Sequence, residues 1–316
     1  MGSLFLPAII AIILGVASAS SLVPQTNLPG KCIPKFVTAL PVFGPAGSIP
    51  RVDAAAHSNL TETMKEIDQT VLPQGKTDSC GMGVTFGKTR VWAYETTDTN
   101  SGTVLGPASW PAVTIDATRS SPVQVEYVNQ LPSFNAASPT GPGLVQGLMP
   151  VDQTVHWADP LNAGCGMMTV DCSSSQSAAA LISGKNQGLP PDVASSVVCG
   201  RVVKTSSRGI SFGSPSSPCC QQYVGPVPAT LHLHGGVIPT DFDGGPDSWF
   251  TPDGRKGSGY TTIGSPGAGK AIYRYANIQE PGTLWFHDHT LGVTRLNVAA
   301  GLAGGSVNHK GTKSPN

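Results

Sequence analysis

The chain alternates short runs of strand-forming residues with clusters of Gly, Pro, Ser and Asn, a pattern that predicts strands separated by turns. The clearest run, Val123–Asn129, alternates apolar and polar side chains with a period of two, as in a strand buried on one face. Further strand-forming runs occupy residues 90–96, 112–117, 229–234, 271–277 and 282–287. Many short strands of this kind favour an antiparallel sandwich or barrel.

Three stretches depart from this pattern. Residues 20–85 show no sustained alternation, so we expect an irregular N-terminal segment with one short helix over 61–69. Residues 157–227 are rich in Ser, Gly, Pro and Cys, and we interpret them as a long insertion pinned by disulfides rather than as core. Residues 305–316 are polar and predict no strand. The expected domain is therefore 86–304, interrupted by the insertion.

The N-terminus has the character of an export signal. The run Leu4–Ala17 is apolar and uncharged, but it is shorter than the ~20 residues that a membrane-spanning helix requires. Small residues at 17–19 suit a cleavage site. We therefore expect a signal peptide at 1–19 and a secreted, extracellular protein without a membrane segment; an uncleaved anchor is the alternative. In an oxidising compartment most of the seven cysteines should pair, and the odd number leaves at least one over.

Composition narrows the possible partners. Lys plus Arg is 19 and Asp plus Glu is 19, so the formal net charge is zero, and only 12% of residues are charged. Nucleic acids and anionic membranes bind basic surfaces, so we expect neither as a partner. The 38 glycines and 28 prolines fit a turn-rich β protein better than a helical one.

Four of the seven histidines form two His-x-His pairs, His232 with His234 and His287 with His289. Side chains in a strand repeat with a period of two, so both histidines of a pair project from one face, roughly 6–7 Å apart. Neutral imidazole is a ligand for copper, zinc, iron and nickel, and neither pair has a nearby Cys or Glu that would complete a structural zinc site. The spacing thus predicts a metal site and leaves the metal open, since zinc hydrolases and lyases also use such pairs.

The residues around the two pairs resemble the multicopper oxidase family, in its spore-coat laccase and bilirubin oxidase branch. The resemblance rests on His-Leu-His-Gly-Gly at 232–236, Trp-Phe-His-Asp-His at 285–289 and Thr-Arg-Leu-Asn at 294–297, with weaker similarity at 35–41 and 150–156. It implies an all-β fold, a cupredoxin-like Greek-key β-sandwich, here carrying the long Cys/Ser/Gly-rich insertion. It also implies copper as the cofactor.

The same resemblance implies roles for individual residues. In this family a trinuclear type 2/type 3 copper cluster reduces O₂ to water. By motif position His232 resembles the type 2 ligand, and His234, His287 and His289 resemble type 3 ligands. Asp243 resembles an acidic residue that assists proton delivery, and its alternative interpretation is a turn-forming Asp before Gly.

The remaining candidates have plainer interpretations. Asp288 should point away from the ligand face, either holding an imidazole through its other nitrogen or facing solvent. The isolated histidines His57, His156 and His309 are interpreted as structural or surface residues, and the aromatic residues Trp249, Phe250, Trp285 and Phe286 as packing the core or walling the cluster.

Two motifs of the family do not occur in this sequence. The His-Pro-x-His-Leu-His motif is absent, and no cysteine has a histidine on either side, so there is no type 1 copper ligand set. The resemblance therefore implies a half-site only, in an N-terminal domain that is truncated and inactive by itself, and the enzyme class stays open. In the complete enzyme the partners are O₂ and a small-molecule or metal-ion reductant. The alternatives are a non-enzymatic copper-binding module that associates with the missing domains or another chain, and a zinc enzyme.

Overall fold

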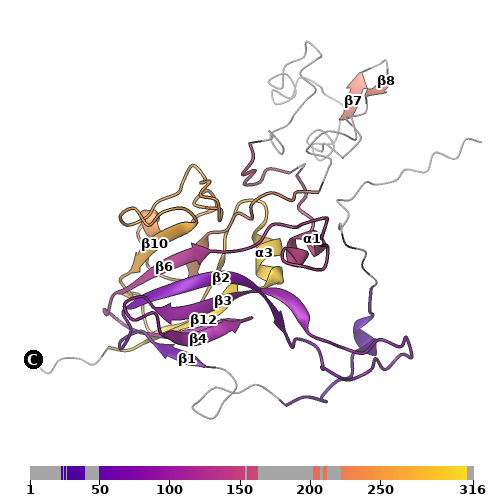
Figure 1. Cartoon of the computed structure of the whole chain (residues 1–316). Coiled ribbons are helices and arrows are strands. Elements are labelled where there is room, and N and C mark those ends of the chain that lie inside the picture. The colour runs from indigo at the N-terminus through magenta and orange to yellow at the C-terminus, as the bar shows by residue number, and fades with distance from the viewer. Residues whose placement is uncertain are drawn as a thin grey trace, which may run out of the picture.

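The computed structural model describes residues 23, 25, 27–39, 50–153, 155–162, 202–206, 209–211 and 222–311. Two five-stranded sheets pack face to face with few helices, which confirms the predicted cupredoxin-like β-sandwich (Figure 1). The predicted signal peptide and the cysteines at 165, 172, 199, 219 and 220 lie outside the described residues.

The first sheet carries both histidine pairs. Its strand order is β1 (Arg51–Asp53), β5 (Ala112–Thr118), β12 (Ala303–His309), β11 (Gly282–Asp288) and β9 (Leu231–His234). Strand β11 pairs antiparallel with both β12 and β9, whereas β5 pairs parallel with β1 and with β12. Strand β9 is therefore the edge of this sheet, beside β11.

The second sheet covers the first. Its order is β10 (Lys270–Tyr275), β6 (Val123–Asn129), β2 (Asn59–Gln69), β3 (Thr89–Asp98) and β4 (Val104–Ser109). The other elements of the described residues are the helices α1 (Leu144–Leu148) and α3 (Thr294–Ala300), the 3-10 turns η1 (Gly30–Cys32) and η3 (Thr240–Phe242), and the hairpin β7 (Val202–Ser206) and β8 (Gly209–Ser211). Within the described part of the chain, no helix combines the length and apolar character that a membrane crossing requires.

The alternating runs form strands where the pattern predicts them. The six predicted runs correspond to β3, β5, β6, β9, β10 and β11. In β6 buried and half-buried side chains alternate over all seven residues, because inward positions carry Val, Tyr and Asn while outward positions carry Gln, Glu and Val. The inward side chains of both sheets form one core, which includes Leu60, Met64, Tyr94, Leu231, Tyr273, Phe286 and Leu302.

The helix predicted over 61–69 is wrong, because these residues belong to strand β2. Leu60, Glu62 and Met64 point inward at every second position and are at most 1% exposed. The carboxylic acid at the middle position conceals the alternation in the sequence, and the neighbouring Met, Lys and Glu residues favour a helix locally. Strand β1 also lies within the segment 20–85.

The prediction that residues 305–316 form no strand is wrong for residues 305–309, which continue β12. Their inward side chains are small or polar, and Ser306 and Asn308 are both buried. Two neighbouring strands supply backbone hydrogen bonds, and the Asn308 amide donates to the Gln279 carbonyl oxygen at 2.9 Å. Backbone pairing on both sides therefore holds a strand that has no hydrophobic pattern of its own.

Both ends of the stretch 157–227 contribute to the core, contrary to the interpretation of the whole stretch as an insertion. Val227 is buried in the main core. Trp157 and Tyr223 pack edge to face with ring centroids 4.7 Å apart, and with Trp249 and Val293 they form a second buried cluster. The insertion therefore leaves and re-enters the domain through buried aromatic residues.

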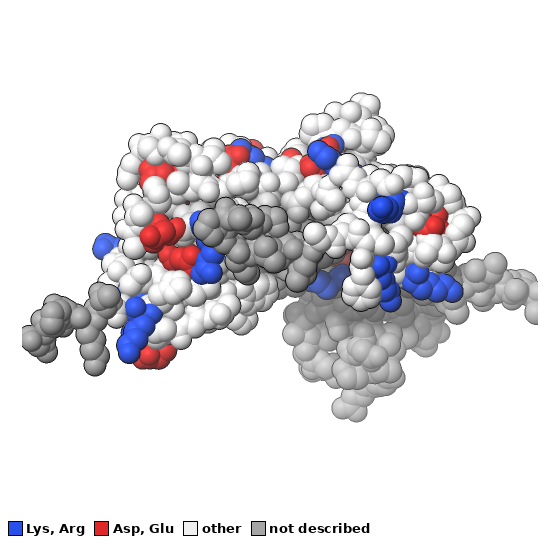
Figure 2. Space-filling model, turned by 90° about the horizontal axis from the view of Figure 1, so that it is seen from below, with Lys and Arg blue, Asp and Glu red and all other residues white. Residues whose placement is uncertain are grey.

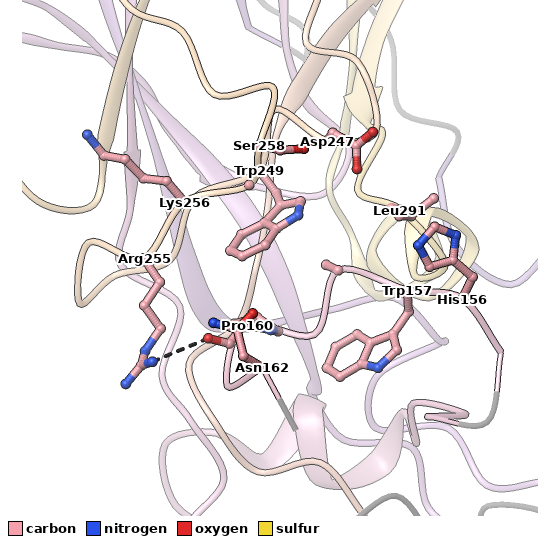
Figure 3. Close-up of a pocket in the computed structure, with 12 residues that line it drawn as sticks. His156, Trp157, Pro160, Asn162, Asp247, Trp249, Arg255, Lys256, Ser258 and Leu291 are labelled. Carbon is pink, nitrogen blue, oxygen red and sulfur yellow. Dashed lines mark hydrogen bonds between the residues drawn. The ribbon is translucent and has the colours of Figure 1, made fainter. Parts of the chain in front are cut away.

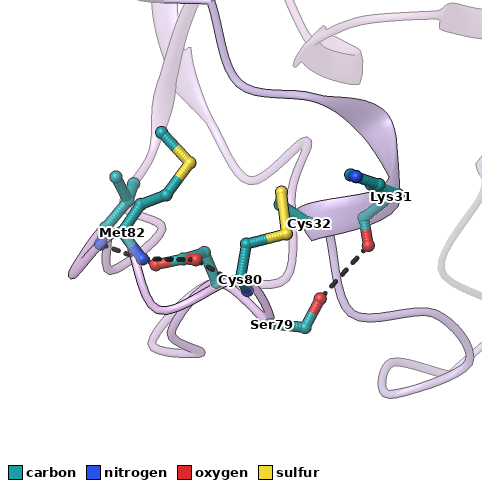
Figure 4. Close-up of a disulfide and its surroundings, with 7 residues drawn as sticks. Lys31, Cys32, Ser79, Cys80 and Met82 are labelled. Atoms are coloured by element: carbon teal, nitrogen blue, oxygen red, sulfur yellow. Dashed lines mark hydrogen bonds between the residues drawn. A yellow bond between two sulfur atoms is a disulfide. The ribbon is translucent and has the colours of Figure 1, made fainter.

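Among the described residues, a disulfide joins Cys32 to Cys80 and ties η1 to the loop that precedes β3 (Figure 4). The Asp78 carboxylate organises this loop by accepting hydrogen bonds from the backbone N–H groups of Cys80, Met82 and Val84, each 2.9 Å long. These bonds hold the pKa of Asp78 below its ordinary value.

Charged side chains of both signs are spread over a largely uncharged surface on the face in Figure 2. Several are ion-paired across strands, as in Arg90 with Asp68 at 2.7 Å and Lys270 with Glu126 at 3.0 Å. Pairs of this kind contribute little stability individually, because water screens them.

Candidate metal centre

The pairing of β9 with β11 brings the two histidine pairs together. The strands run antiparallel, with His232 opposite His287 and Trp285 opposite His234. His232 and His234 follow the period of two on β9, as Trp285 and His287 do on β11, so these side chains meet on one face of the sheet. His289 lies one residue beyond the end of β11. Two motifs about fifty residues apart in sequence thus share one site.

The imidazole rings lie within contact distance of one another. Nitrogen atoms of His232, His234 and His287 all fall within 4.8 Å of each other, and His234 Nδ1 is 3.2 Å from His287 Nε2. The ring of His289 is 5.2 Å from that of His232 and 5.8 Å from that of His287, centroid to centroid. The four rings converge, with three of them forming the tightest group.

Backbone carbonyl groups orient two of these rings. Nδ1 of His232 is 2.7 Å from the carbonyl oxygen of Asp243, and Nδ1 of His287 is 2.7 Å from that of Asp288. A carbonyl oxygen only accepts, so each Nδ1 carries the proton, and in the neutral ring Nε2 keeps its lone pair. Burial lowers the pKa of His287 and so favours the neutral form that binds a metal.

The donor set fits a copper ion. It is made of imidazole nitrogen, a borderline ligand that suits copper and also zinc. The Nδ1 atom of His289 is buried and has no hydrogen-bond partner among the described residues. A buried polar atom without a partner is costly, and a metal ion is one means of satisfying it.

The Asp288 carboxylate holds the end of β11 in place, and of this residue only the backbone carbonyl oxygen contacts an imidazole, that of His287. The Asp288 side chain is fully buried, so neither sequence-based interpretation of its carboxylate is correct. The carboxylate accepts hydrogen bonds from the Thr230 and Thr290 N–H groups, the Thr290 hydroxyl and the Asn297 amide, at 2.8–3.1 Å. Burial, only partly offset by these donors, raises its pKa to about 6.

Sequence reasoning missed the role of Asn297, although the residue lies in the Thr-Arg-Leu-Asn segment quoted above. Its amide bridges the Asp288 carboxylate at 3.1 Å and the Pro228 carbonyl oxygen at 3.0 Å. Asn297 is buried on α3. The helix therefore locks β11 to the segment leading into β9, which holds the two histidine-bearing strands in register.

Asp243 lies beside the cluster, at the end of η3. Its carboxylate Oδ1 is 3.3 Å from His232 Nδ1, and its side chain is 43% exposed. Gly244 follows with φ of +66° and lies against β9, since a Cβ atom there would be 1.6 Å from the Leu231 carbonyl oxygen. The expected turn is thus present, and it presses the Asp243 backbone against His232.

The other aromatic candidates divide between core and surface. Phe250 and Phe286 are buried in the core, and Trp249 in the second cluster. Trp285 is 41% exposed and stacks on His287 with ring centroids 4.1 Å apart. It therefore walls the cluster, one of the two roles expected for it.

His156 lies apart from the four converging rings. It lines a separate pocket of about 430 Å³, with Trp157, Trp249 and Arg255, and none of the four histidines lines that pocket (Figure 3). Arg255 closes one side by donating to the Pro160 carbonyl oxygen at 3.3 Å. The surface histidines pair with acids instead, His57 with Asp98 and His309 with Asp116.

Known proteins similar to this chain were found by sequence and by structure. No protein-family model matches it. It is 42% identical to Multicopper oxidase LPR1 homolog 5 of Oryza sativa subsp. japonica over 97 residues, 30% of this chain and 14% of the relative. It is 42% identical to a laccase of Bacillus subtilis (strain 168) over 83 residues, 26% of this chain and 15% of the relative. These matches span about one seventh of each relative's length.

Solved structures overlap the chain as well. A multicopper oxidase from Campylobacter jejuni, described as a metallo-oxidase, has a TM-score of 0.38 and 16% identity, and the overlap covers 90% of this chain and 32% of that one. Three observations therefore agree: the sequence matches, the two-sheet sandwich and the cluster of histidines. The chain is thus similar in sequence to multicopper oxidases and laccases over 30% and 26% of its length, and it folds as a cupredoxin-like sandwich.

Proposed function

We propose that this chain is the copper-binding N-terminal domain of a secreted multicopper oxidase. His232, His234, His287 and His289 would supply half of the type 2/type 3 ligands. The observation that carries the proposal is the group of three imidazoles whose nitrogen atoms lie within 4.8 Å of one another. The two carbonyl-bound Nδ1 atoms support it, because a proton on Nδ1 leaves the ligand lone pair of His232 and His287 on Nε2.

When bound, the copper would supply electron transfer to O₂. The protein's own part is to orient the imidazoles and to move protons. Asp243 suits the second task, because its carboxylate is within 3.3 Å of His232 Nδ1 and is partly exposed. A carboxylate placed between a ligand and solvent can pass protons in either direction. Phenols, pigments or metal ions are the proposed reductants of the complete enzyme.

We propose that the chain by itself does not turn over as an oxidase. Its sequence has no cysteine flanked by histidine and therefore no type 1 copper ligand set. Four imidazoles are half of the ligand set that the family resemblance implies. Incomplete coordination weakens metal binding, so we expect copper to bind without sustained O₂ reduction.

Copper stoichiometry tests the proposal directly. The purified chain is titrated with Cu(II), and bound copper is measured by elemental analysis and electron paramagnetic resonance. His287→Gln should remove most of the binding, because this ring is central to the group, whereas His156→Gln should bind copper as the unmodified chain does. Equal binding by the unmodified chain and His287→Gln would place the copper elsewhere.

Two further measurements separate the alternatives. O₂ consumption with a phenolic reductant and copper should stay at the level of a protein-free control, and clear uptake would contradict the inactivity. Zinc competition distinguishes the metals. A chain that retains zinc against copper and hydrolyses ester substrates would be a zinc enzyme instead.

A further inference from the structure

The indole of Trp285 contacts two of the three clustered imidazoles. Trp285 precedes His287 by two residues on β11 and lies opposite His234 on β9, so all three side chains share one face of the sheet. The indole stacks on His287 with centroids 4.1 Å apart and planes at 29°. It also lies 5.4 Å from the ring of His234, at 31°.

The stacked indole restrains one face of the His287 ring, whereas the hydrogen bonds of this ring lie at its edge. The opposite constraint is the bond from His287 Nδ1 to the Asp288 carbonyl oxygen at 2.7 Å. Between the indole face and this bond, rotation of the ring about its Cβ–Cγ bond would break one contact or the other. His287 Nε2 is thereby aimed at His234 Nδ1, 3.2 Å away.

The exposure of the two side chains indicates what the indole does there. Trp285 is 41% exposed, whereas His287 beneath it is 6% exposed. An exposed indole contributes less to core packing than a buried one. The indole therefore serves as a cover over a metal-ligand candidate.

We propose that Trp285 is a positioning residue, whose stacked indole holds the His287 ring in the ligand orientation and shields it from water, and so tightens metal binding. The inference rests on the proposed function, since it concerns the same cluster. An aromatic pair adds only modestly to the area it buries, so the effect should be a change in affinity rather than loss of the site.

The test compares Trp285→Leu, which keeps an apolar side chain, with Trp285→Phe, which keeps an aromatic face. The control is Ile278→Ala, which removes another exposed apolar side chain, 51% exposed. Dissociation constants for Cu(II) are measured by competition with a chelator. We expect about 2- to 10-fold weaker binding for Trp285→Leu, recovery for Trp285→Phe, and no change for the control. Apo-protein melting temperatures should be alike for the Leu and Phe variants, which a purely structural role would not produce.

Tryptophan fluorescence of the unmodified chain gives a second readout. The chain has five tryptophans, and Trp285 is the exposed one while the other four are buried or half-buried. One equivalent of Cu(II) should quench the solvent-exposed emission, and Zn(II) should not. Unquenched exposed emission with copper bound would overturn the proposal, even if the Leu variant failed to fold.

The two levels of inference fail differently. Equal copper affinities for the unmodified chain and Trp285→Leu would overturn the role of Trp285 and leave the copper site standing. Absence of copper binding by the unmodified chain would overturn both.

Discussion

Replacing Glu62 with glutamine should remove most of the pH dependence of this protein's stability between pH 5 and 8. Glu62 lies on β2 inside the sandwich and is 1% exposed. Its Oε1 accepts a hydrogen bond from the Thr96 hydroxyl at 2.8 Å, and its Oε2 has no partner among the described residues. Burial is the main reason that its pKa rises to about 8, and the Thr96 bond opposes the rise.

The sign follows from proton binding. The folded chain keeps the Glu62 proton up to about pH 8, whereas the unfolded chain releases it near the ordinary value of 4.5. The favourable contribution is therefore complete below pH 4.5 and is lost as pH rises towards 8. At about 1.4 kcal/mol per pH unit the loss is at most about 5 kcal/mol, a large fraction of the 5–15 kcal/mol typical of a domain.

The assay is urea unfolding at pH 5, 6, 7 and 8. The stability of Glu62→Gln should lie within about 1 kcal/mol of that of the unmodified chain at pH 5, where both side chains are neutral in the folded state and of equal size, and should exceed it at pH 8. Glu280→Gln is the matched control, because that side chain is 79% exposed and paired with Arg119; it should keep the original slope. Parallel pH profiles for Glu62→Gln and the unmodified chain would refute the reasoning.

Three other predictions concern the residues that support the site and the N-terminal disulfide. Asp288→Ala removes the acceptor of four buried donors and should lower the free energy of unfolding by about 3 kcal/mol or more, with Asp288→Asn in between; a loss below about 1 kcal/mol would contradict the network's role. Gly244→Ala should cost more stability than Gly264→Ala and should also weaken copper binding. The two glycines have φ of +66° and +65°, but only a Cβ atom at Gly244 would have backbone atoms within 4 Å. Equal melting temperatures for the two variants would contradict this prediction. Cys32→Ser and Cys80→Ser should each cost about 4 kcal/mol, because either opens the same 48-residue loop; unequal losses in urea unfolding would point to another pairing.

The local alternation of apolar and polar residues was sufficient to predict many of the strands. The alternation in β6 is visible in the sequence because Val123, Val125 and Tyr127 occupy every second position. The same period of two placed His232 with His234, and His287 with His289, on one face each. Both inferences need only the geometry of a single strand, which depends on neighbouring residues alone.

Strands without a hydrophobic pattern could not be predicted in this way. In β2 an inward position holds Glu62, and in β12 the inward positions hold Gly304, Ser306 and Asn308. These strands exist because partners on both sides satisfy their backbone groups. Which strands become neighbours is decided by long-range packing.

The sequence alone therefore determined the residue types of the candidate site and their pairing within each strand, and the resemblance supplied the family. Only the tertiary structure set His232 opposite His287, laid Trp285 on His287 and brought the Asp243 carbonyl to His232. The first contact joins strands about fifty residues apart, so it depends on strand order and register, which no local pattern encodes. The other two link residues closer in sequence, and they form only when the side chains and the turn at Asp243 are packed in place.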